Sequence, residues 1–436
     1  MKHHFDHLYW VWLSLACGTA SKAVPTLMER YEDPFDLYRL DEEEIEQMEG
    51  IRPSLKGKLA QKSLERSYAI LHRCQEEGIE IIPYADPRYP ARLRAIVDPP
   101  LVLYCKGKLP DLESKLCVGM VGTRKMSEYG KQSAYTISYE LAATRAVVVS
   151  GMAKGVDAVC SCGALTAGGE TVVVLGSGVN VIYPKVNTVL YQQILKHGAV
   201  ISEYPPDTDP FAGNFPKRNR IISGLSHGVV VIEGKEGSGS LITADYAIEQ
   251  GREIFALPGQ VDVHNSEGPN NLIQKGARMA RSARDVVNFY EFLFRDELRY
   301  KALEAAERKK TPCEQAMETY GLPLGEDQYQ AEKTKKSVPR KEKATTSVTE
   351  NPQKTSTQAK ATADEKAWLT DRSEEILASM DEISRRVFAR LPVDHAVSPD
   401  ALTASGIGIG DVLIALSMLE INGLVASLPG GMYIRK

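Results

Sequence analysis

The hydrophobic pattern of this 436-residue chain changes character along its length. Up to about residue 78, apolar positions recur three and four residues apart, which predicts a helical domain over residues 1–78. From residue 79 to about residue 300, short apolar runs alternate with helical patterns. The runs are apolar at nearly every position, as expected for strands that are covered on both faces. They are residues 101–104, 116–121, 146–149, 171–175, 199–201, 228–232 and 253–256.

This alternation predicts the fold class. Strands joined by helices imply right-handed β-α-β crossovers, and hence an α/β domain with a Rossmann-like, doubly wound parallel sheet over residues 79–300. The helical region in front of it contains a tight turn at residues 48–55. That turn fits either a helix-hairpin-helix module, which binds DNA backbone through main-chain amides, or a small SAM-like packing domain. Because the glycines and cations of the first alternative are sparse, the pattern favours the packing domain.

Two regions follow the predicted sheet. Residues 301–371 are dominated by charged, Thr, Gln, Ser and Ala residues. Since such a segment buries too little apolar surface to offset the entropy of ordering, we expect a flexible linker. Three short helical patterns and two apolar runs around a Pro-Gly-Gly turn then predict a winged-helix domain over residues 372–436. Its helix at residues 411–421 carries no basic residue, which favours a protein contact or a vestigial role over DNA reading.

Bulk composition restricts the functional classes. A content of 43% hydrophobic and 25% charged residues is ordinary for globular proteins, and the net charge of −4 means that nucleic-acid binding requires a local basic patch. Seven cysteines, an odd number in a long chain, predict a reducing cytoplasm rather than a disulfide framework. No apolar run has the length of a transmembrane helix, so no membrane association is expected. Neither the N-terminal histidines nor Cys160 and Cys162 have convincing metal-ligand spacing, so no metal or cofactor is predicted.

The most informative segment is the cationic stretch that begins at Phe215. It continues through Lys217, Arg218, Asn219 and Arg220 into an apolar helical pattern. Cations this dense resist burial, because only an anionic partner replaces their lost hydration. Phosphate is such a partner, and the Phe215 ring offers a face on which an unpaired base can stack. The alternative is a solvated helix start whose arginines bind nearby carbonyl groups.

Small and polar residues follow almost every predicted strand. In a doubly wound sheet these positions lie at the carboxyl edge, where ligands collect. Glycine lets main-chain amides approach an anion closely, and helix N-termini add a partial positive charge. With the arginines, these residues predict an extended phosphate-binding rim. The rim residues are Gly122, Thr123 and Arg124, then Ser150, Gly151 and Lys154, and then Gly237, Ser238, Gly239 and Ser240.

Common nucleotide-binding and catalytic signatures are missing from the sequence. It contains neither a P-loop nor a Gly-x-Gly-x-x-Gly turn with the expected carboxylate, which disfavours an ATPase and a dehydrogenase. Asp157 and Glu233 are carboxylates near the rim; Asp157 fits a helix cap, whereas Glu203 and Glu233 fit anchors for arginines. An acid/base pair stays open as an alternative, but no His accompanies them. We therefore predict no catalytic residue and no enzyme.

These motifs, in this order, resemble the DNA-processing protein A family, DprA (also called Smf), the bacterial mediators of natural transformation. The helical front and the winged-helix tail are similar to that family's flanking modules, with weaker motifs. The resemblance rests on residues 122–124, 129–130, 150–157, 171–178, 183–184, 202–203, 215–225, 238–240, 243–244, 258–259 and 268–273.

The resemblance implies a protein that binds single-stranded DNA, forms homodimers through its sheet domain and helps to load the RecA recombinase. It also implies that Arg124 contacts a backbone phosphate, that Phe215 meets a base, and that Arg218 and Arg220 line the same pocket. Two positions depart from the family pattern. Ser161 stands where the family usually has a His, and no basic residue directly precedes Phe215.

Two competing hypotheses belong to other functional classes. One is a nucleotide-processing enzyme of the phosphoribohydrolase (lysine-decarboxylase-like) type, whose Pro-Gly-Gly-x-Gly-Thr-x-x-Glu loop corresponds to residues 237–243. Thr243 stands where the catalytic Glu of that family would lie, which argues against hydrolysis. The other is a structural adaptor that acts through the C-terminal tail.

Overall fold

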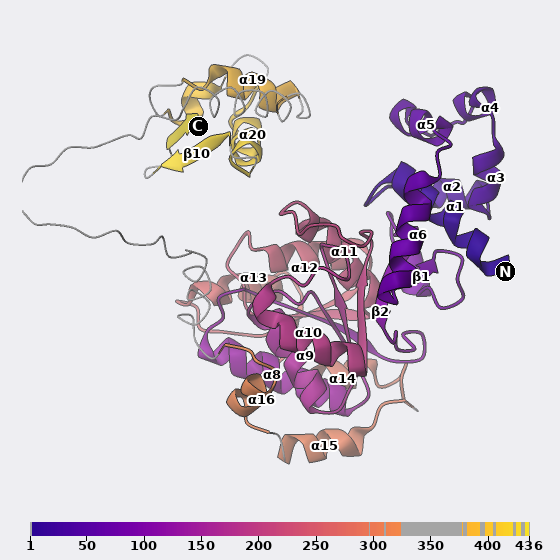
Figure 1. The fold of residues 1–436 in the computed structure, drawn as a ribbon. Helices are drawn as coiled ribbons and strands as arrows, with labels where there is room; N and C mark the ends of the chain where they lie inside the picture. Colours follow the sequence, from indigo (N-terminus) through magenta and orange to yellow (C-terminus); the bar gives the residue numbers. More distant parts are fainter. Residues whose placement is uncertain are drawn as a thin grey trace, which may run out of the picture. The chain divides into compact units, whose positions relative to one another are not determined.

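The computed structural model describes residues 2–295, 297–308, 311–323, 377, 382–392, 397–403, 407–421, 424–428 and 432–435. The chain divides into two compact units, Met1–Val338 and Pro339–Lys436. The first unit contains the helical front and the sheet (Figure 1). None of the described helices is both long and apolar enough to cross a lipid bilayer.

Six helices form the front of the first unit. Asp41 and Glu44 form a capping box that begins α4, since each side chain accepts a hydrogen bond from the other residue's main-chain N–H. Apolar side chains of these helices, such as Leu13 and Leu27, share one buried cluster with Tyr104 of the sheet. The helices therefore pack against the sheet as part of one core. They are α1 (Lys2–Cys17), α2 (Val24–Arg30), α3 (Pro34–Arg39), α4 (Glu42–Glu46), α5 (Pro53–Ala60) and α6 (Glu65–Glu77).

A nine-stranded sheet forms the centre of this unit, in the order β1-β2-β6-β5-β4-β3-β7-β8-β9. All seven predicted strands are present, and the prediction of an α/β fold with a doubly wound parallel sheet is confirmed, although the observed sheet is mixed and mostly parallel. Two antiparallel pairs, β1 with β2 and β2 with β6, lie at one edge and were not indicated by the sequence. The strands are β1 (Glu80–Pro83), β2 (Val102–Gly107), β3 (Cys117–Val121), β4 (Val147–Ser150), β5 (Thr171–Val174), β6 (Gly198–Ser202), β7 (Gly228–Val231), β8 (Glu253–Ala256) and β9 (Arg278–Met279).

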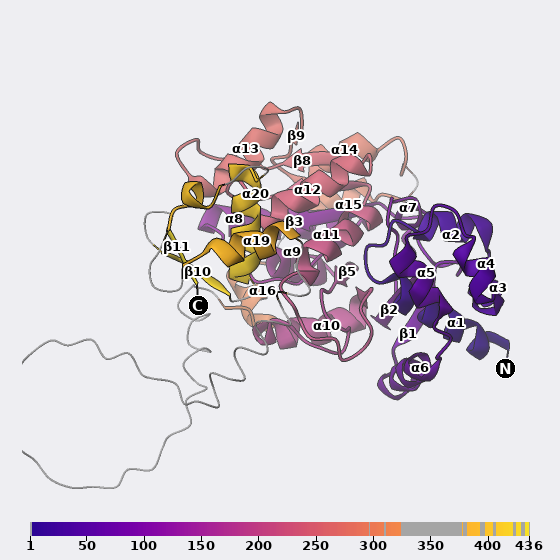
Figure 2. The ribbon, with the colours of Figure 1, turned by 90° about the horizontal axis from the view of Figure 1, so that it is seen from above.

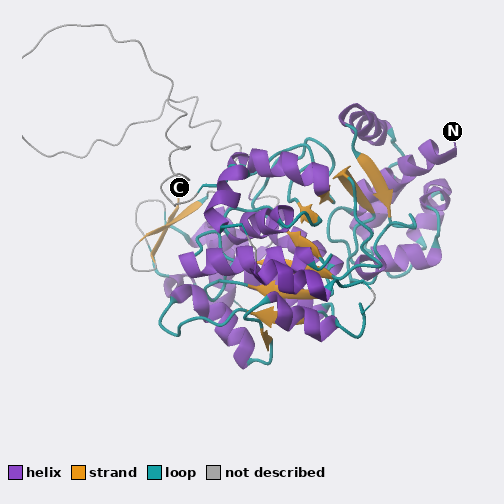
Figure 3. Cartoon of the chain, turned by 90° about the horizontal axis from the view of Figure 1, so that it is seen from below, coloured by secondary structure: helices purple, strands orange, loops and turns teal. Residues whose placement is uncertain are grey.

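Helices cover both faces of the sheet (Figures 2 and 3). Alternate strand residues point to opposite faces, so that Val118 and Met120 belong to one buried cluster while Cys117 and Val121 belong to the other. The first face packs against α8 (Glu128–Ala143), α9 (Val156–Thr166), α10 (Thr188–His197) and α14 (Ala283–Tyr290). The second packs against α7 (Ala91–Arg94), α11 (Asn214–Leu225), α12 (Gly239–Glu249) and α13 (Glu267–Gln274). Both faces are buried, which explains why the strand sequences lack polar alternation.

The predicted linker is wrong in its first part. It contains two helices, α15 (Tyr300–Arg308) and α16 (Cys313–Thr319), in contact with α8 and α9. Leu303, Ala306 and Met317 are buried there, because apolar residues recur on one helical face despite the charged composition. The part of the predicted linker beyond residue 323 lies outside the described residues.

The second unit is the expected winged helix. It comprises α19 (Glu382–Arg390), η3 (Pro399–Leu402), α20 (Ile409–Ile421) and a hairpin of β10 (Val425–Leu428) with β11 (Met432–Arg435). Val397 adds an isolated antiparallel bridge to Tyr433. Phe388, Leu416 and Val425 lie in its own buried cluster, so this unit has a hydrophobic core of its own.

Candidate nucleic-acid interface

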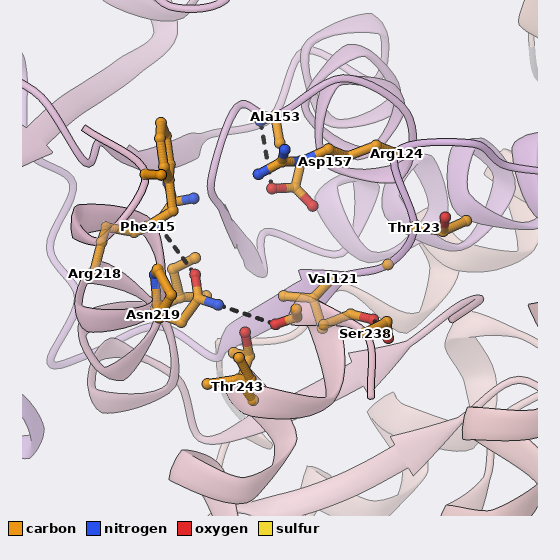
Figure 4. Close-up of a pocket in the computed structure, with 17 residues that line it drawn as sticks. Val121, Thr123, Arg124, Ala153, Asp157, Phe215, Arg218, Asn219, Ser238 and Thr243 are labelled. Carbon is orange, nitrogen blue, oxygen red and sulfur yellow. Dashed lines mark hydrogen bonds between the residues drawn. The ribbon is translucent and has the colours of Figure 1, made fainter. Parts of the chain in front are cut away.

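A cavity of about 420 Å³ opens at the carboxyl ends of the central strands. β4, β5 and β6 follow β3 on one side of the sheet, whereas β7 and β8 lie on the other side of it. The cavity is therefore located where the strand order reverses, the usual ligand position in doubly wound sheets. Its walls come from the loop after β3, the beginning of α9, the first turns of α11 and the beginning of α12 (Figure 4). Its lining includes Gly122, Thr123, Arg124, Asp157, Phe215, Arg218, Asn219, Ile222, Ser238, Gly239, Ser240 and Thr243.

One face of α11 forms a wall of this cavity. Phe215, Arg218, Asn219 and Ile222 line it, and their spacing of three, four and seven residues places them on one helical face. Figure 4 shows the first three side by side on the same helix. The helical period thus separates the cationic segment into residues that face the cavity and residues that do not.

The Phe215 ring lies close to two cationic groups. The guanidinium carbons of Arg124 and Arg218 are 5.8 and 5.9 Å from the ring centroid, within the range of cation–π contacts. The exposed ring of Tyr183 lies 5.6 Å from it, centroid to centroid. The sequence did not predict this pairing with Tyr183, although residues 183–184 are among those on which the family resemblance rests. The cavity wall thus combines an aromatic face with two positive charges.

Arg218 is a buried cation whose hydrogen-bond partners are uncharged. It is 4% exposed and donates through Nη1 to the carbonyl oxygens of Gly151, at 2.7 Å, and of Val174. Burial lowers the pKa of Arg218 to about 10, so the group remains charged at neutral pH. None of the ion pairs found among the described residues includes it. The Asp157 carboxylate acts on Arg218 without forming a direct ion pair with it. A buried charge that has no direct ion pair and faces a cavity is suited to an anionic ligand.

Gly151 supports this arrangement, although it does not line the cavity. A Cβ atom at this position would lie 2.5 Å from Nη2 of Arg218. Glycine is therefore required for the guanidinium to rest on the main chain.

The beginning of α12 forms another wall. Ser238 is the N-cap residue, but its side chain makes no capping hydrogen bond; its hydroxyl lies 2.8 Å from that of Ser240. Asn219 donates to the Gly239 carbonyl at 3.1 Å, which ties α11 to this helix. The free main-chain N–H groups of a helix N-terminus, together with the helix dipole, favour an anion here.

The structure places Arg220 away from the cavity, which corrects its expected position in the same pocket as Arg218. The Arg220 side chain is fully buried, with Nη2 2.8 Å from the Glu203 carboxylate and Nε 3.3 Å from that of Asp98. It lies two residues from Arg218 and so points to a different side of α11. The prediction that Glu203 anchors an arginine agrees with this geometry.

Four further rim residues also lie outside the cavity lining: Ser150, Lys154, Lys217 and Gly237. The Ser150 hydroxyl is buried and donates to the Met120 carbonyl at 2.8 Å, a cross-link between strands. Lys217 and Gly237 are exposed.

Glu233 and Asp157, the two carboxylates predicted to lie near the rim, differ in their surroundings. Glu233 does not anchor an arginine; it accepts hydrogen bonds from the main-chain N–H and the hydroxyl of Ser127 and so fixes the beginning of α8. Asp157 lines the cavity, where Figure 4 shows it near Arg124. Burial raises the pKa of Asp157, while Arg218 and Arg124 act in the opposite direction. The apolar lining residues, such as Ile222, carried no functional signal in the sequence.

The fold and the cavity define a class of protein: a Rossmann-like α/β protein with an arginine- and aromatic-lined cavity at the switch point of its sheet. Comparison with known proteins narrows this class. The family model described as DNA recombination-mediator protein A matches residues 80–291, and the DprA winged-helix model matches residues 370–431.

Individual proteins match over much of their length. The DNA processing protein DprA of Bacillus subtilis is 43% identical over 239 residues, which cover 54% of this chain and 80% of that protein. The X-ray structure of DprA from Streptococcus pneumoniae superposes with a TM-score of 0.57 at 35% identity, covering 64% of this chain and 97% of that one. The chain therefore belongs to the DprA/Smf family of DNA recombination mediators.

Proposed function

We propose that this protein binds single-stranded DNA as a non-enzymatic recombination mediator, and that it protects incoming DNA and loads RecA during natural transformation. The observation that carries the proposal is that the Phe215 ring lies 5.8 and 5.9 Å from the guanidinium carbons of Arg124 and Arg218, and that all three side chains line one cavity. Arginines attract phosphates, and an aromatic ring stacks on a base of any sequence. A base reaches such a ring only when it is unpaired, so the site favours single strands.

The partners in this proposal come from the family. Its model describes recombination mediators, so a recombinase of the RecA type is the partner that fits, with a homodimer of this chain in the cytoplasm as the active form. The winged-helix unit supplies a second folded module, and the lack of basic residues along α20 fits a contact with protein better than a contact with DNA.

The test is a titration of labelled oligo-dT and of a duplex of equal length at two salt concentrations. We expect tighter binding of oligo-dT, with an affinity that falls steeply as salt rises, because each neutralised phosphate releases counterions. Equal affinity for the duplex, or an affinity that does not respond to salt, would contradict the proposal.

The nucleotide-processing alternative has a specific chemical requirement. Thr243, which lines the cavity and is buried, offers no carboxylate where a phosphoribohydrolase would need its Glu. Asp157 is the carboxylate in the lining, and it lies on α9 instead. Nucleoside monophosphates should stay intact during prolonged incubation with the protein; release of free base would reverse the ranking of the two functions.

The adaptor alternative is tested by truncation. Because α15 and α16 pack on the sheet unit, the cut belongs after residue 323 rather than at residue 301. A truncated chain that still binds single-stranded DNA would show that this binding does not require the tail.

A further inference from the structure

The carboxylate of Asp157 is an unexpected group in the cavity wall. It is 7% exposed, lies in the first turn of α9 and borders the same cavity as Phe215. It accepts a long hydrogen bond from the Ala153 main-chain N–H, 3.4 Å from Oδ2, and a second one from the main chain of Gly151, and the charges of Arg218 and Arg124 act on it. The ion pairs found among the described residues do not include it. Because a carboxylate has about four acceptor positions, the positions that the main chain does not use can accept from a group in the cavity.

A phosphate is the wrong occupant for the space beside this carboxylate. Two negative groups at close range repel each other, and a phosphate offers the carboxylate no hydrogen-bond donor. Arg124 is exposed at the cavity mouth and also acts on Asp157, so a phosphate that it binds must approach it from the solvent side. The group that satisfies Asp157 must instead carry N–H donors and must fit next to an aromatic face. The hydrogen-bonding edge of a nucleobase has both properties.

The size of the cavity agrees with such an occupant. Its volume of about 420 Å³ lies within the range of small-molecule pockets, about 300–1,000 Å³. The apolar side chain of Ile222 and the Phe215 ring supply contacts for a flat, unpaired base, while Asp157 supplies an acceptor.

We propose that Asp157 determines a base preference: it accepts a hydrogen bond from the exocyclic amino group of an inserted base, and the cavity therefore selects cytosine over uracil or thymine. Cytosine presents an amino donor at the position where uracil presents a carbonyl acceptor, which a carboxylate disfavours. This inference rests on the proposed function, since it assigns the base-reading group within the same single-strand site.

The experiment compares oligo-dC with oligo-dU of equal length by fluorescence anisotropy, at slightly alkaline pH where cytosine strands stay unpaired. The wild-type protein should bind oligo-dC about tenfold to a hundredfold more tightly, the scale of one hydrogen bond to a charged group. Asp157→Asn, which offers a donor as well as an acceptor, should bring the ratio of the two affinities close to one. Asp245→Asn removes the same charge from an exposed position on α12, outside the cavity lining, and should keep the wild-type ratio.

A modified oligonucleotide tests the same hydrogen bond without a substitution in the protein, so the result does not depend on whether a variant folds. An oligonucleotide of N4,N4-dimethylcytosine lacks the amino donors, so the wild-type protein should bind it no better than oligo-dU.

The outcomes separate this inference from the proposed function. Equal wild-type affinities for oligo-dC and oligo-dU, a ratio that Asp157→Asn does not change, or tight binding of the dimethylated strand would each overturn the base preference while leaving single-strand binding intact. A protein that binds neither oligonucleotide, or that binds duplex equally well, would overturn the proposed function and the preference with it.

Discussion

The guanidinium of Arg220 and the carboxylate of Glu203 form a buried pair, with Nη2 of the arginine 2.8 Å from both carboxylate oxygens. Asp98 lies 3.3 Å from Nε of the same arginine, and the Ala20 main-chain N–H donates to Glu203 at 3.3 Å. The pair thereby joins α11, the end of β6 and the segment after α1. Cavity and pair lie on different sides of one helix, so Arg218 and Arg220 have separate roles.

We expect Arg220→Ala to destabilise the fold rather than to remove a DNA contact. Removing one partner of a buried ion pair leaves the other charge uncompensated, at a cost of about 3–5 kcal/mol. Urea unfolding measures this loss. The folded fraction should bind oligo-dT with the wild-type dependence on salt.

Glu203→Gln provides the control for that prediction, because it breaks the same pair without removing a cation. It should lower the free energy of unfolding and keep the salt dependence. If the Arg220 variant unfolds like the wild type, and if it alone shows a flatter salt dependence, Arg220 contacts DNA and the prediction is wrong.

Arg124→Ala should weaken binding of every single-stranded oligonucleotide. One lost phosphate contact lowers the slope of log affinity against log salt by about 0.7 for single strands. Anisotropy titrations over a series of salt concentrations measure this slope. Lys196→Ala removes one exposed charge at the end of α10, ahead of β6 and away from the carboxyl edge, and should leave the slope unchanged. Equal slopes for the two variants would remove Arg124 from the phosphate contacts.

Phe215→Ala should weaken binding by about 1–3 kcal/mol, the cost of losing one stacked base. The slope against salt should stay near the wild-type value, because no charge is removed. Phe215→Tyr keeps an aromatic face and should bind like the wild type. If the Ala variant binds with unchanged affinity but unfolds at lower urea concentration, the ring serves the core instead.

Because His227 is partly buried in its uncharged form, we expect the free energy of unfolding to fall in acid. Its Nδ1 accepts a hydrogen bond from the Cys117 main-chain N–H at 3.0 Å, and burial lowers the pKa of His227 to about 3. The unfolded chain protonates this side chain near pH 6.5, so between pH 6.5 and 3 the unfolded state binds more protons than the folded state. The free energy of unfolding therefore falls as pH falls through this window, by up to about 1.4 kcal/mol per pH unit from this group.

His227→Gln keeps an acceptor but cannot take up the proton, so its unfolding free energy should depend less on pH. Urea unfolding at several pH values between 7 and 4 measures the difference, and His72→Gln on the exposed side of α6 is the control. Parallel pH profiles for the wild type and the His227 variant would contradict the assignment.

The central strands were predictable because burial on both faces leaves continuous apolar runs, as in β5 and β7. β1 and β9 escaped notice because they are short and begin with the charged residues Glu80 and Arg278. Strand direction leaves no mark on periodicity, so the antiparallel pairing of β2 with β6 could not be foreseen. The helices α15 and α16 were hidden by charged residues on their solvent-facing sides.

The candidate site was predictable in kind but not residue by residue. Glycines and serines after β3 and before α12 identified the edge of the sheet where the cavity lies. The density of cations along residues 217–220 did not show which side chains face the cavity. Residues two apart on a helix lie on nearly opposite sides of it, so Arg218 and Arg220 cannot both face the cavity. That distinction requires the orientation of α11, which is set by Ile221 and Leu225 packing on the sheet.

The shared core of the front helices and β2 limits how this architecture can be shortened. Val102 and Tyr104 are covered by the same cluster that holds Trp10 and Leu13. Deleting the residues before β1 would expose these side chains to solvent and leave an apolar surface that favours self-association. A natural or designed chain without the front helices would need polar residues in place of these apolar ones before it could stay in solution.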